Sequence, residues 1–354
     1  MTINNHYMHR CLELAKLGAG NVAPNPMVGA VLVHNEKIIG EGYHEKFGEA
    51  HAEVNCINSV YEENKSVISS STLYVLLEPC VHYGNTPPCA DLIIESKIPH
   101  VVIGCRDPFP LVDGKGIEKL QQAGIYVEVG ILEDECIQLN QRFITFYTKQ
   151  RPYSILKWAQ SANGKINTTG TERLLISNDF TNRLVHKWRS EEAAILVGTN
   201  TALLDNPELT NRLWNGKGPI RLVIDKDLRL PLSLNLFNGE QTTIIFHCAK
   251  HNGESDIDDF INHRVIYYKA SPEKNMIQQI MYACYQLNIQ SILVEGGATL
   301  LQSFIDEGLW DEARVITNNS LHVAEGLSAP ELKNYKQVMS ENIFNDSIDY
   351  FIRE

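Results

Sequence analysis

The sequence predicts an α/β fold in two domains, each built from a sheet flanked by helices. First, 354 residues with 44% apolar content are enough to bury two cores, and this length exceeds that of a typical single domain. Second, short apolar runs typical of strands alternate with segments of helical spacing through both halves. Third, this pattern breaks at 149–152, so we expect domains at 1–149 and 150–354.

The N-terminal half begins with a helix, because apolar side chains recur at helical spacing over 6–17 and Gly18 and Gly20 follow. A second helix is expected after residue 50, with His51 and Glu53 near its start, where the backbone dipole favours negative charge. The order of the elements predicts a mixed sheet. Further strands are expected at 30–33, 38–43, 72–77, 100–104 and 125–129, and further helices at 90–96, 116–123 and 133–147.

The C-terminal half starts again with a strand at 153–159, and residues 177–179 cap a helix that extends to residue 189. A buried strand at 193–198 is followed by a turn at 199–201. Residues 294–300 lead a strand through two glycines into a helix, which suits either a pyrophosphate held on free N–H groups or a simple tight turn. Further strands are expected at 221–225, 243–247, 265–268 and 291–295, and a helix at 272–287.

Three residues of the N-terminal half have the chemistry of a zinc site. His51, Cys80 and Cys89 offer one imidazole and two thiolates, which leave a fourth position for a water whose pKa falls to about 7. Glu53, two residues after the histidine, can take a proton from that water and pass it to a leaving amine. We expect the ligands at the N-termini of two neighbouring helices. The site therefore predicts hydrolytic deamination.

The spacing of the two cysteines departs from the usual deaminase pattern. Zinc-dependent nucleobase deaminases show H-x-E followed by P-C-x-x-C, whereas eight residues, 81–88, separate Cys80 from Cys89. Gly84 and the two prolines before Cys89 offer a turn and a stiff return that could fix the ends of this longer loop. The alternatives are a structural zinc, which usually has four Cys or His ligands and no neighbouring acid, or two ordinary buried thiols.

Two further polar residues are candidates for substrate contacts. Asn25 lies between two prolines at a strand entrance, where its amide could read the edge of a base or merely form a turn. Lys115 follows a predicted strand at the carboxyl edge of the sheet, where it could meet a phosphate or remain solvated.

Composition excludes several classes of protein. A net charge of −12 argues against a protein that tracks nucleic acid, although a small anionic substrate needs only a few placed cations. The eight cysteines are irregularly spaced, which fits a reducing compartment better than a disulfide framework. No stretch approaches the length of a membrane span and the N-terminus is polar, so we expect a cytoplasmic protein that binds neither nucleic acid nor membrane.

With these motifs assembled, the chain resembles, over nearly its whole length, the bifunctional riboflavin-biosynthesis deaminase/reductase family. The most specific shared feature is the long loop between the cysteines, which ends in Thr86-Pro87-Pro88-Cys89. The other shared motifs are Ala23-Pro24-Asn25-Pro26 with Val28-Gly29, His51-Ala52-Glu53, Leu77-Glu78-Pro79-Cys80, and Asp107-Pro108 with Gly114-Lys115-Gly116.

The resemblance implies a cytidine-deaminase-like N-terminal domain and a dihydrofolate-reductase-like C-terminal domain, with Zn²⁺ and NADPH as cofactors. The first domain would deaminate 2,5-diamino-6-ribosylamino-4(3H)-pyrimidinone 5′-phosphate, with Glu53 carrying the proton. The second would take hydride from NADPH to open the ribosyl group to a ribityl chain. The expected partner is therefore a small pyrimidine ribose-phosphate, and we expect a homo-oligomer, either a dimer or a tetramer.

Matching positions of the family motifs supply the expected contacts of the reductase domain. Arg189 and Arg212 are plausible phosphate partners, because a guanidinium pairs bidentately with phosphate oxygens. The expected cofactor contacts are Ala159, Thr201, Asp205, Gly296, Gly297, Ala298 and Thr299. The expected substrate contacts are Asn25 in the first domain and Arg173, Leu175, Arg189, Leu209, Arg212 and Glu295 in the second.

Three departures from the family motifs leave an alternative open. Asn163 replaces an aspartate in Ser161-Ala162-Asn163-Gly164, and Phe109 replaces an asparagine after Asp107-Pro108. Arg173-Leu174-Leu175 replaces a Ser-x-Trp stretch that would touch substrate, so the alternative is an enzyme that only deaminates and keeps an inactive reductase-like domain. A nucleic-acid base editor is disfavoured by the acidic charge. A non-catalytic zinc-stabilised interaction protein would leave Glu53 without a task.

Overall fold

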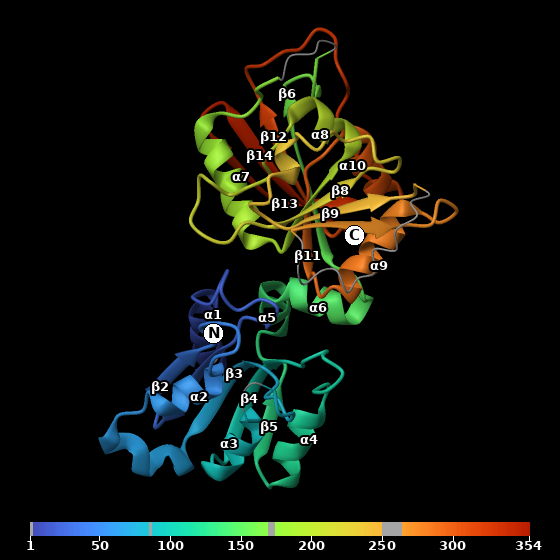
Figure 1. Ribbon diagram of the computed structural model, residues 1–354. Coiled ribbons are helices and arrows are strands. Elements are labelled where there is room, and N and C mark those ends of the chain that lie inside the picture. Colours follow the sequence, from blue (N-terminus) through green and yellow to red (C-terminus); the bar gives the residue numbers. More distant parts are fainter. Residues whose placement is uncertain (1–2, 85–86, 169–173, 250–263) are drawn as a thin grey trace. The chain divides into compact units, whose positions relative to one another are not determined.

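The computed structural model describes residues 3–84, 87–168, 174–249 and 264–354, and Arg173 lies outside these described residues. The chain divides into two compact units, Met1–Gln150 and Arg151–Glu354 (Figure 1). Both are α/β units, as predicted. Within the described ranges, no helix combines the length and the apolar character that a membrane crossing needs.

The first unit contains a five-stranded mixed sheet in the order β2-β1-β3-β4-β5. The strand β1 (Gly29–His34) pairs antiparallel with β2 (Lys37–Tyr43) and with β3 (Thr72–Leu77). The strands β3, β4 (His100–Cys105) and β5 (Tyr126–Val129) run parallel. The three central strands are largely buried because helices cover both faces of the sheet.

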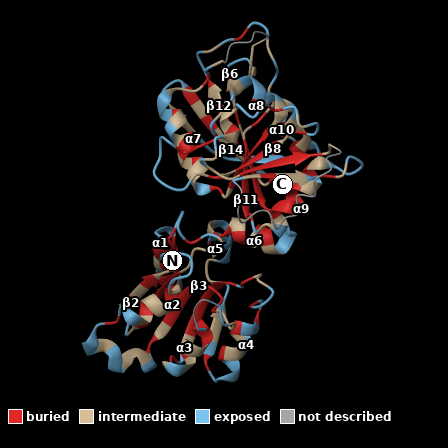
Figure 2. Cartoon of the chain, viewed as in Figure 1, coloured by how far each residue is buried: buried red, intermediate tan, exposed pale blue. Residues whose placement is uncertain are grey.

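Each face of this sheet has its own apolar core. Met8 and Cys11 of the first helix pack with Leu76 and Phe143 on one face, and Cys56 packs with side chains of residues 89–95 and 115–122 on the other. Figure 2 shows the buried residues concentrated on the strands, with exposed residues on the outer surfaces of the helices. The helices are α1 (Ile3–Lys16), α2 (Ala52–Asn58), η1 (Glu62–Ser70), α3 (Cys89–Glu95), α4 (Lys115–Gln122), α5 (Glu133–Leu139) and α6 (Gln141–Lys149).

The prediction of one long helix at 133–147 is wrong, because the chain forms two helices that meet at Asn140. The Asn140 amide leaves the helix pattern to pair with the backbone of Met27: its Oδ1 accepts from the Met27 N–H at 2.8 Å, and its Nδ2 donates to the Met27 carbonyl at 2.9 Å. This long-range contact holds the segment that contains Asn25. The 3₁₀ helix η1 was also not predicted, since its residues bury no continuous apolar stripe.

The second unit contains a nine-stranded sheet in the order β10-β9-β8-β7-β11-β6-β12-β14-β13. The strands from β10 to β12 in this order run parallel to one another. The strand β14 pairs antiparallel with both β12 and β13. The strands are β6 (Tyr153–Ser161), β7 (Ala194–Gly198), β8 (Ile220–Ile224), β9 (Thr243–His247), β10 (Val265–Lys269), β11 (Ser291–Val294), β12 (Glu312–Asn318), β13 (Tyr335–Ile343) and β14 (Asp346–Arg353).

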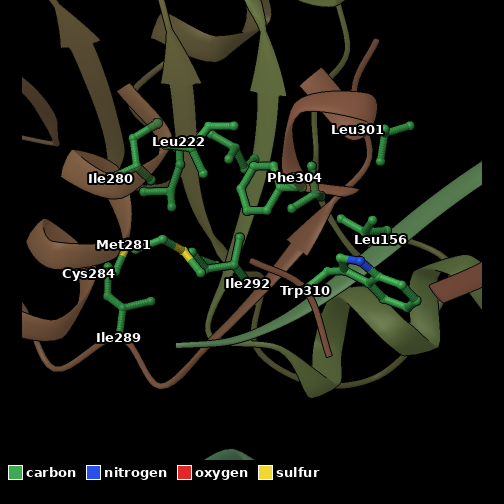
Figure 3. Packing of buried hydrophobic residues seen from close by; sticks show 14 of the residues in the cluster. Leu156, Leu222, Ile280, Met281, Cys284, Ile289, Ile292, Leu301, Phe304 and Trp310 are labelled. Carbon is green, nitrogen blue, oxygen red and sulfur yellow. The ribbon is translucent and has the colours of Figure 1, made fainter. Parts of the chain in front are cut away.

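The largest core of the second unit lies between this sheet and its helices. Phe304 and Trp310 are fully buried there with Leu156, Leu222 and Ile292 of the strands (Figure 3). The described helices are α7 (Asp179–Glu191), α8 (Thr199–Asp205), η2 (Asn235–Phe237), α9 (Met276–Gln286) and α10 (Ala298–Asp306).

Two boundaries in the second unit differ from prediction. The turn predicted at 199–201 is instead the first turn of α8, which follows directly on β7 because Gly198 adopts the extended conformation of a helix N-cap. The helix predicted from 272 begins at Met276, since the Asn275 side chain caps it by accepting from Ile277 and Gln278 N–H.

Parallel strands bring distant residues to one edge of this second sheet. Neighbouring strands β7, β11 and β6 end at Gly198, Val294 and Ser161. Open α/β sheets bind ligands outside the carboxyl ends of their strands. The residues that follow β7 and β11 therefore lie where a ligand of this unit would bind.

Candidate active sites

The first unit brings together the three predicted metal ligands. His51 is the N-cap residue of α2, Cys89 is the first residue of α3, and Cys80 follows β3 after Glu78-Pro79. The His51 Nδ1 atom lies 3.6 Å from the Cys80 Sγ atom and 3.4 Å from the Cys89 Sγ atom. The ligand atoms of these three side chains all lie within 4.8 Å of one another. Among the described residues, they form a group of histidine, cysteine or acidic side chains that could share a metal ion.

These separations fit a tetrahedral zinc ion. Zn–S and Zn–N bonds of about 2.3 and 2.0–2.1 Å at a tetrahedral angle place the sulfur and nitrogen atoms about 3.6 Å apart. The two measured Nδ1–Sγ distances differ from that value by at most 0.2 Å. The donor set of one imidazole and two sulfurs also suits zinc and leaves room for a fourth, non-protein ligand.

The electrostatics of the group favour a thiolate at Cys80. A hydrogen bond from the Cys89 thiol, together with His51, lowers the pKa of Cys80 to about 4. The hydrogen bond with Cys80 raises the pKa of the Cys89 thiol, and another hydrogen bond with Cys80 raises the pKa of His51. The Cys89 N–H also donates to Cys80 Sγ at 3.4 Å. Negative charge is therefore held beside the imidazole, as a cation site requires.

Glu53 lies in the first turn of α2 and is only 4% exposed. Burial raises the pKa of its carboxyl group, against the opposing effect of His51. The side chain lines a cavity of about 300 Å³ together with His51 and Cys80. A buried carboxyl group with a raised pKa beside a ligand cavity is suited to accepting and returning a proton.

Asn25 lines the same cavity, and His44 fixes the orientation of its amide. The His44 Nδ1 atom lies 3.0 Å from the Ala50 carbonyl oxygen, which can only accept, so Nδ1 carries the proton. The His44 Nε2 atom therefore accepts from Asn25 Nδ2 at 3.1 Å. Burial lowers the pKa of His44, which favours this neutral form. Sequence reasoning missed His44, because its role depends on two contacts that no local pattern indicates.

Asp107 and Glu78 are two more buried acids that sequence reasoning did not assign to a role. Asp107 lines the cavity, and burial raises the pKa of its carboxyl group to about 7. Glu78 is 3% exposed, and its two oxygens accept four backbone N–H groups. The donors are Asp107 at 3.3 Å, Gly114 at 3.0 Å, Gly116 at 2.9 Å and Ile117 at 3.2 Å. Glu78 thus caps α4 and ties the cavity loop at 107–114 to the strand end that carries Cys80.

Replacing Glu78 by alanine is expected to lower the stability of the first unit. Four buried N–H groups lose a charged acceptor, and each hydrogen bond to a charged group contributes about 1.5–3 kcal/mol, so a loss of at least about 2 kcal/mol is expected. Calorimetric unfolding of the full chain measures it. All four tryptophans belong to the second unit, so an unchanged tryptophan-fluorescence transition is the internal control. An unshifted calorimetric profile would contradict the capping role.

In the second unit, three charged side chains form a largely buried cluster at the carboxyl edge of the sheet. Arg189 Nε and Nη2 donate to the two oxygens of Glu295, both at 2.7 Å, and Lys157 Nζ lies 3.6 Å from Glu295. Burial opposes ionisation of Glu295, but Arg189 and Lys157 outweigh it and lower its pKa to about 2. Burial and the nearby cations lower the pKa of His186 to about 4. Sequence reasoning missed Lys157, which lies within β6.

The predicted phosphate partners differ in their environment. Arg189 is committed to Glu295 and also donates from Nη1 to the Thr210 carbonyl at 3.1 Å. The Arg212 side chain is 56% exposed and pairs with Glu208 at 3.1 Å. Arg212 is therefore the more accessible cation for a phosphate.

The two leucines that are predicted substrate contacts differ in how far they are exposed. Leu175 is 75% exposed, whereas Leu209 is 2% exposed and packs in an apolar core with Ile195 and Val223. Lys115, the possible phosphate contact of the first unit, donates to the Pro110 carbonyl at 2.8 Å. Leu175, Arg212 and Lys115 are exposed, whereas Leu209 is a core residue.

Three of the predicted cofactor residues, Gly296, Gly297 and Thr201, lie at or beside the start of α10. Gly297 adopts φ +64°, and a Cβ atom there would lie 3.4 Å from Thr201 Oγ1, while one on Gly296 would lie 2.8 Å from Val197 Cα. Gly297 supplies no side-chain hydrogen bond to the helix that it caps, so an anionic group can approach the first N–H groups of α10. Gly296 is therefore required by close packing against β7, and the uncapped N–H groups after Gly297 are the feature that fits a pyrophosphate group.

The other predicted cofactor residues lie on three elements of the second unit. Ala159 is on β6, Asp205 ends α8, and Ala298 and Thr299 are the first two residues of α10. The turn of Ser161-Ala162-Asn163-Gly164 is intact with asparagine: Asn163 accepts from Ser161 Oγ at 2.8 Å and donates to the Val323 carbonyl at 2.8 Å. Asn163 therefore makes hydrogen bonds of its own in the turn, and an ionised aspartate could not donate to the Val323 carbonyl.

Comparisons with known proteins match the two units to two different families of domains. Residues 1–105 match the cytidine and deoxycytidylate deaminase zinc-binding region, and residues 152–320 match the RibD C-terminal domain. The chain is 40% identical over 361 residues to the riboflavin biosynthesis protein RibD of Aquifex aeolicus, covering 99% of both. It is 34% identical over 319 residues to RibD of Escherichia coli, covering 87% of this chain and 86% of that protein.

Solved structures show the same similarity over the full length. The diaminohydroxyphosphoribosylaminopyrimidine deaminase/5-amino-6-(5-phosphoribosylamino)uracil reductase of Thermotoga maritima superposes with a TM-score of 0.85 at 34% identity, covering 99% of both chains. RibD of Acinetobacter baumannii superposes with a TM-score of 0.86 at 33% identity, covering 99% of this chain and 98% of that one.

Proposed function

Because the chain belongs to the RibD family, we propose that residues 1–149 form its zinc-dependent deaminase domain and residues 150–354 its NADPH-dependent reductase domain. The chain is a bifunctional enzyme of riboflavin biosynthesis with both activities. Its proposed substrate is 2,5-diamino-6-ribosylamino-4(3H)-pyrimidinone 5′-phosphate, deaminated first and then reduced to the ribityl product. The observation that carries the proposal is the juxtaposition of His51, Cys80 and Cys89 beside the buried Glu53.

In the deaminase domain, His51, Cys80 and Cys89 would hold the zinc ion, and Glu53 would move the proton. Zinc in this site would act as a Lewis acid and lower the pKa of a water molecule to about 7. Glu53 lies buried in the cavity, where it accepts a proton and returns it to the leaving amine. Asn25, oriented by His44, would hydrogen-bond an edge of the pyrimidine.

In the reductase domain, NADPH would supply hydride, and the chain would hold and orient both molecules. The uncapped N–H groups at the start of α10, after Gly296 and Gly297, would hold the pyrophosphate. The other proposed cofactor contacts are Ala159, Thr201, Asp205, Ala298 and Thr299. Glu295, fixed by Arg189 and Lys157, would contact the sugar, and Arg212 would meet the phosphate. The other proposed substrate contacts are Leu175, Leu209 and Arg173, of which Arg173 lies outside the described residues.

Metal removal tests the division into two domains. We expect a chelator that strips the ion to abolish ammonia release while reduction of the deaminated intermediate continues, because the ligands all belong to the first unit. Ammonia release and NADPH absorbance measure the two steps. Cys89→Ser should abolish zinc binding. The control variant is Cys248→Ser, because Cys248 follows β9 and lies outside the site, and it should keep one zinc per chain. Loss of both activities on chelation would contradict the assignment.

We also propose a homo-oligomer, dimer or tetramer, in the cytoplasm. The long edge strand β13, with exposed Val338 and Met339, supports contact with another copy. The eight cysteines, all free, support a reducing compartment. Light scattering of the purified chain would measure its mass, and a monomer would contradict the first part.

A further inference from the structure

Phe109 lies in the deaminase cavity although the sequence motif around it gave reason to expect an asparagine. The residue follows β4 and lines the same cavity as Glu53, Cys80 and Asn25. Its side chain is partly buried and packs against the apolar core on one face of the sheet. An amide at this position would read a substrate by hydrogen bonding, whereas a phenyl ring offers only its faces and edges.

The backbone around Phe109 is held firmly. Glu78 Oε2 accepts from the N–H groups of Asp107 and Gly114, which bracket the loop. Within the loop, the Phe109 N–H donates to Asp107 Oδ1 at 2.8 Å, and the Phe109 carbonyl accepts from Val112 at 2.8 Å. The position of the ring is therefore set before any ligand binds, which reduces the entropy lost on binding.

Neighbouring rings support Phe109 without stacking parallel to it. The Phe109 ring lies 5.5 Å from the His82 ring and 5.0 Å from the Tyr147 ring, each at an interplanar angle of 63°. Tyr147 in turn packs 4.8 Å from Phe143. All four side chains line the cavity. They form an aromatic wall, defined as His82, Phe109, Phe143 and Tyr147, in a cavity whose other side chains include the polar Asn25 and Glu53.

We propose that Phe109 stacks on the pyrimidine ring of the substrate and helps to determine specificity in the deaminase domain. The inference rests on the proposed function and adds how the face of the ring is recognised. Asn25 and Glu53 can hydrogen-bond the edges of a planar heterocycle, but they cannot discriminate a flat ring from a non-planar ligand. A preorganised phenyl ring does so, because stacking requires a π-face on the ligand.

The test measures binding of separate pieces of the substrate to the full-length zinc-loaded chain. Phe109→Leu keeps apolar volume but removes the π-face. Since base–aromatic stacking contributes about 1–3 kcal/mol, we expect Phe109→Leu to weaken binding of the free base, 2,5,6-triamino-4-pyrimidinone, by about 5- to 150-fold in calorimetry. Binding of ribose 5-phosphate should not change. The KM of deamination should rise with little change in kcat, and Phe109→Tyr should restore most of the lost affinity.

The matched control is Tyr61→Leu, an aromatic residue of the same unit that is 75% exposed and outside the cavity. It should leave both affinities unchanged. Phe109→Met, also apolar and without a ring, should reproduce the loss if the leucine variant does not fold. Unchanged affinity for the free base in Phe109→Leu, or a fall in kcat at constant KM, would overturn the stacking role. Failure of the unaltered chain to release ammonia would instead refute the proposed function, while the calorimetric comparison would still decide on stacking.

Discussion

Replacing Glu53 by glutamine is expected to lower the rate of ammonia release by about 10²–10⁴-fold, the contribution of a positioned general acid–base group. Glutamine keeps the size of the side chain and its hydrogen bonding but cannot carry a proton. Glu53 is buried beside the proposed zinc ligands, and burial already raises the pKa of its carboxyl group. The measurement is ammonia release at saturating substrate, together with zinc content per chain.

Zinc content separates a proton carrier from a metal ligand at this position. We expect Glu53→Gln to keep one zinc per chain, since His51, Cys80 and Cys89 supply the ligand atoms that lie together. Glu62→Gln, at an exposed position of η1, is the matched control and should leave ammonia release unchanged. Loss of zinc in Glu53→Gln would make Glu53 a ligand, and undiminished turnover would remove it from the mechanism.

The metal motif could be predicted from the sequence because its signal is local. Imidazole and thiolate side chains in a recognisable order indicate zinc without knowledge of the fold, and His51 and Cys89 lie at the helix starts that the sequence placed there. Most strands could also be predicted, since each is a short apolar run. Elements that depend only on the local pattern of apolar residues can therefore be predicted from the sequence of that segment alone.

Residues whose role depends on distant partners could not be predicted. Glu78 accepts from N–H groups 29 to 39 positions further along the chain, so its capping role appears only in the folded sheet. Nothing in the sequence around Lys157 distinguishes it from other strand residues. It reaches Glu295 only because β6 and β11 pair in the folded sheet. The strand β13 is mostly exposed and lacks apolar alternation, so its pairing with β14 defines it rather than its composition.

Replacing Glu295 by glutamine is expected to destabilise the second unit by about 3–5 kcal/mol, because removing one partner of a buried ion pair leaves charge uncompensated. Arg189 and Lys157 would both remain as cations, with side chains only 14% and 13% exposed. The lowered pKa of Glu295 gives the sign of the pH dependence. Its stabilising effect is present above the ordinary value of 4.5 and is lost as pH falls toward about 2, so Glu295→Gln should flatten this part of the stability profile.

Denaturant unfolding followed by tryptophan fluorescence measures this effect, since all four tryptophans lie in the second unit. NADPH oxidation with the deaminated intermediate should fall strongly in the same variant, while ammonia release should remain, because Glu53 and the metal ligands belong to the first unit. Glu191→Gln, which removes a surface partner of Lys187 on α7, should change stability by less than about 1 kcal/mol. A stable variant without NADPH oxidation would assign Glu295 to the substrate alone, and unchanged oxidation would place the reductase site elsewhere in the unit.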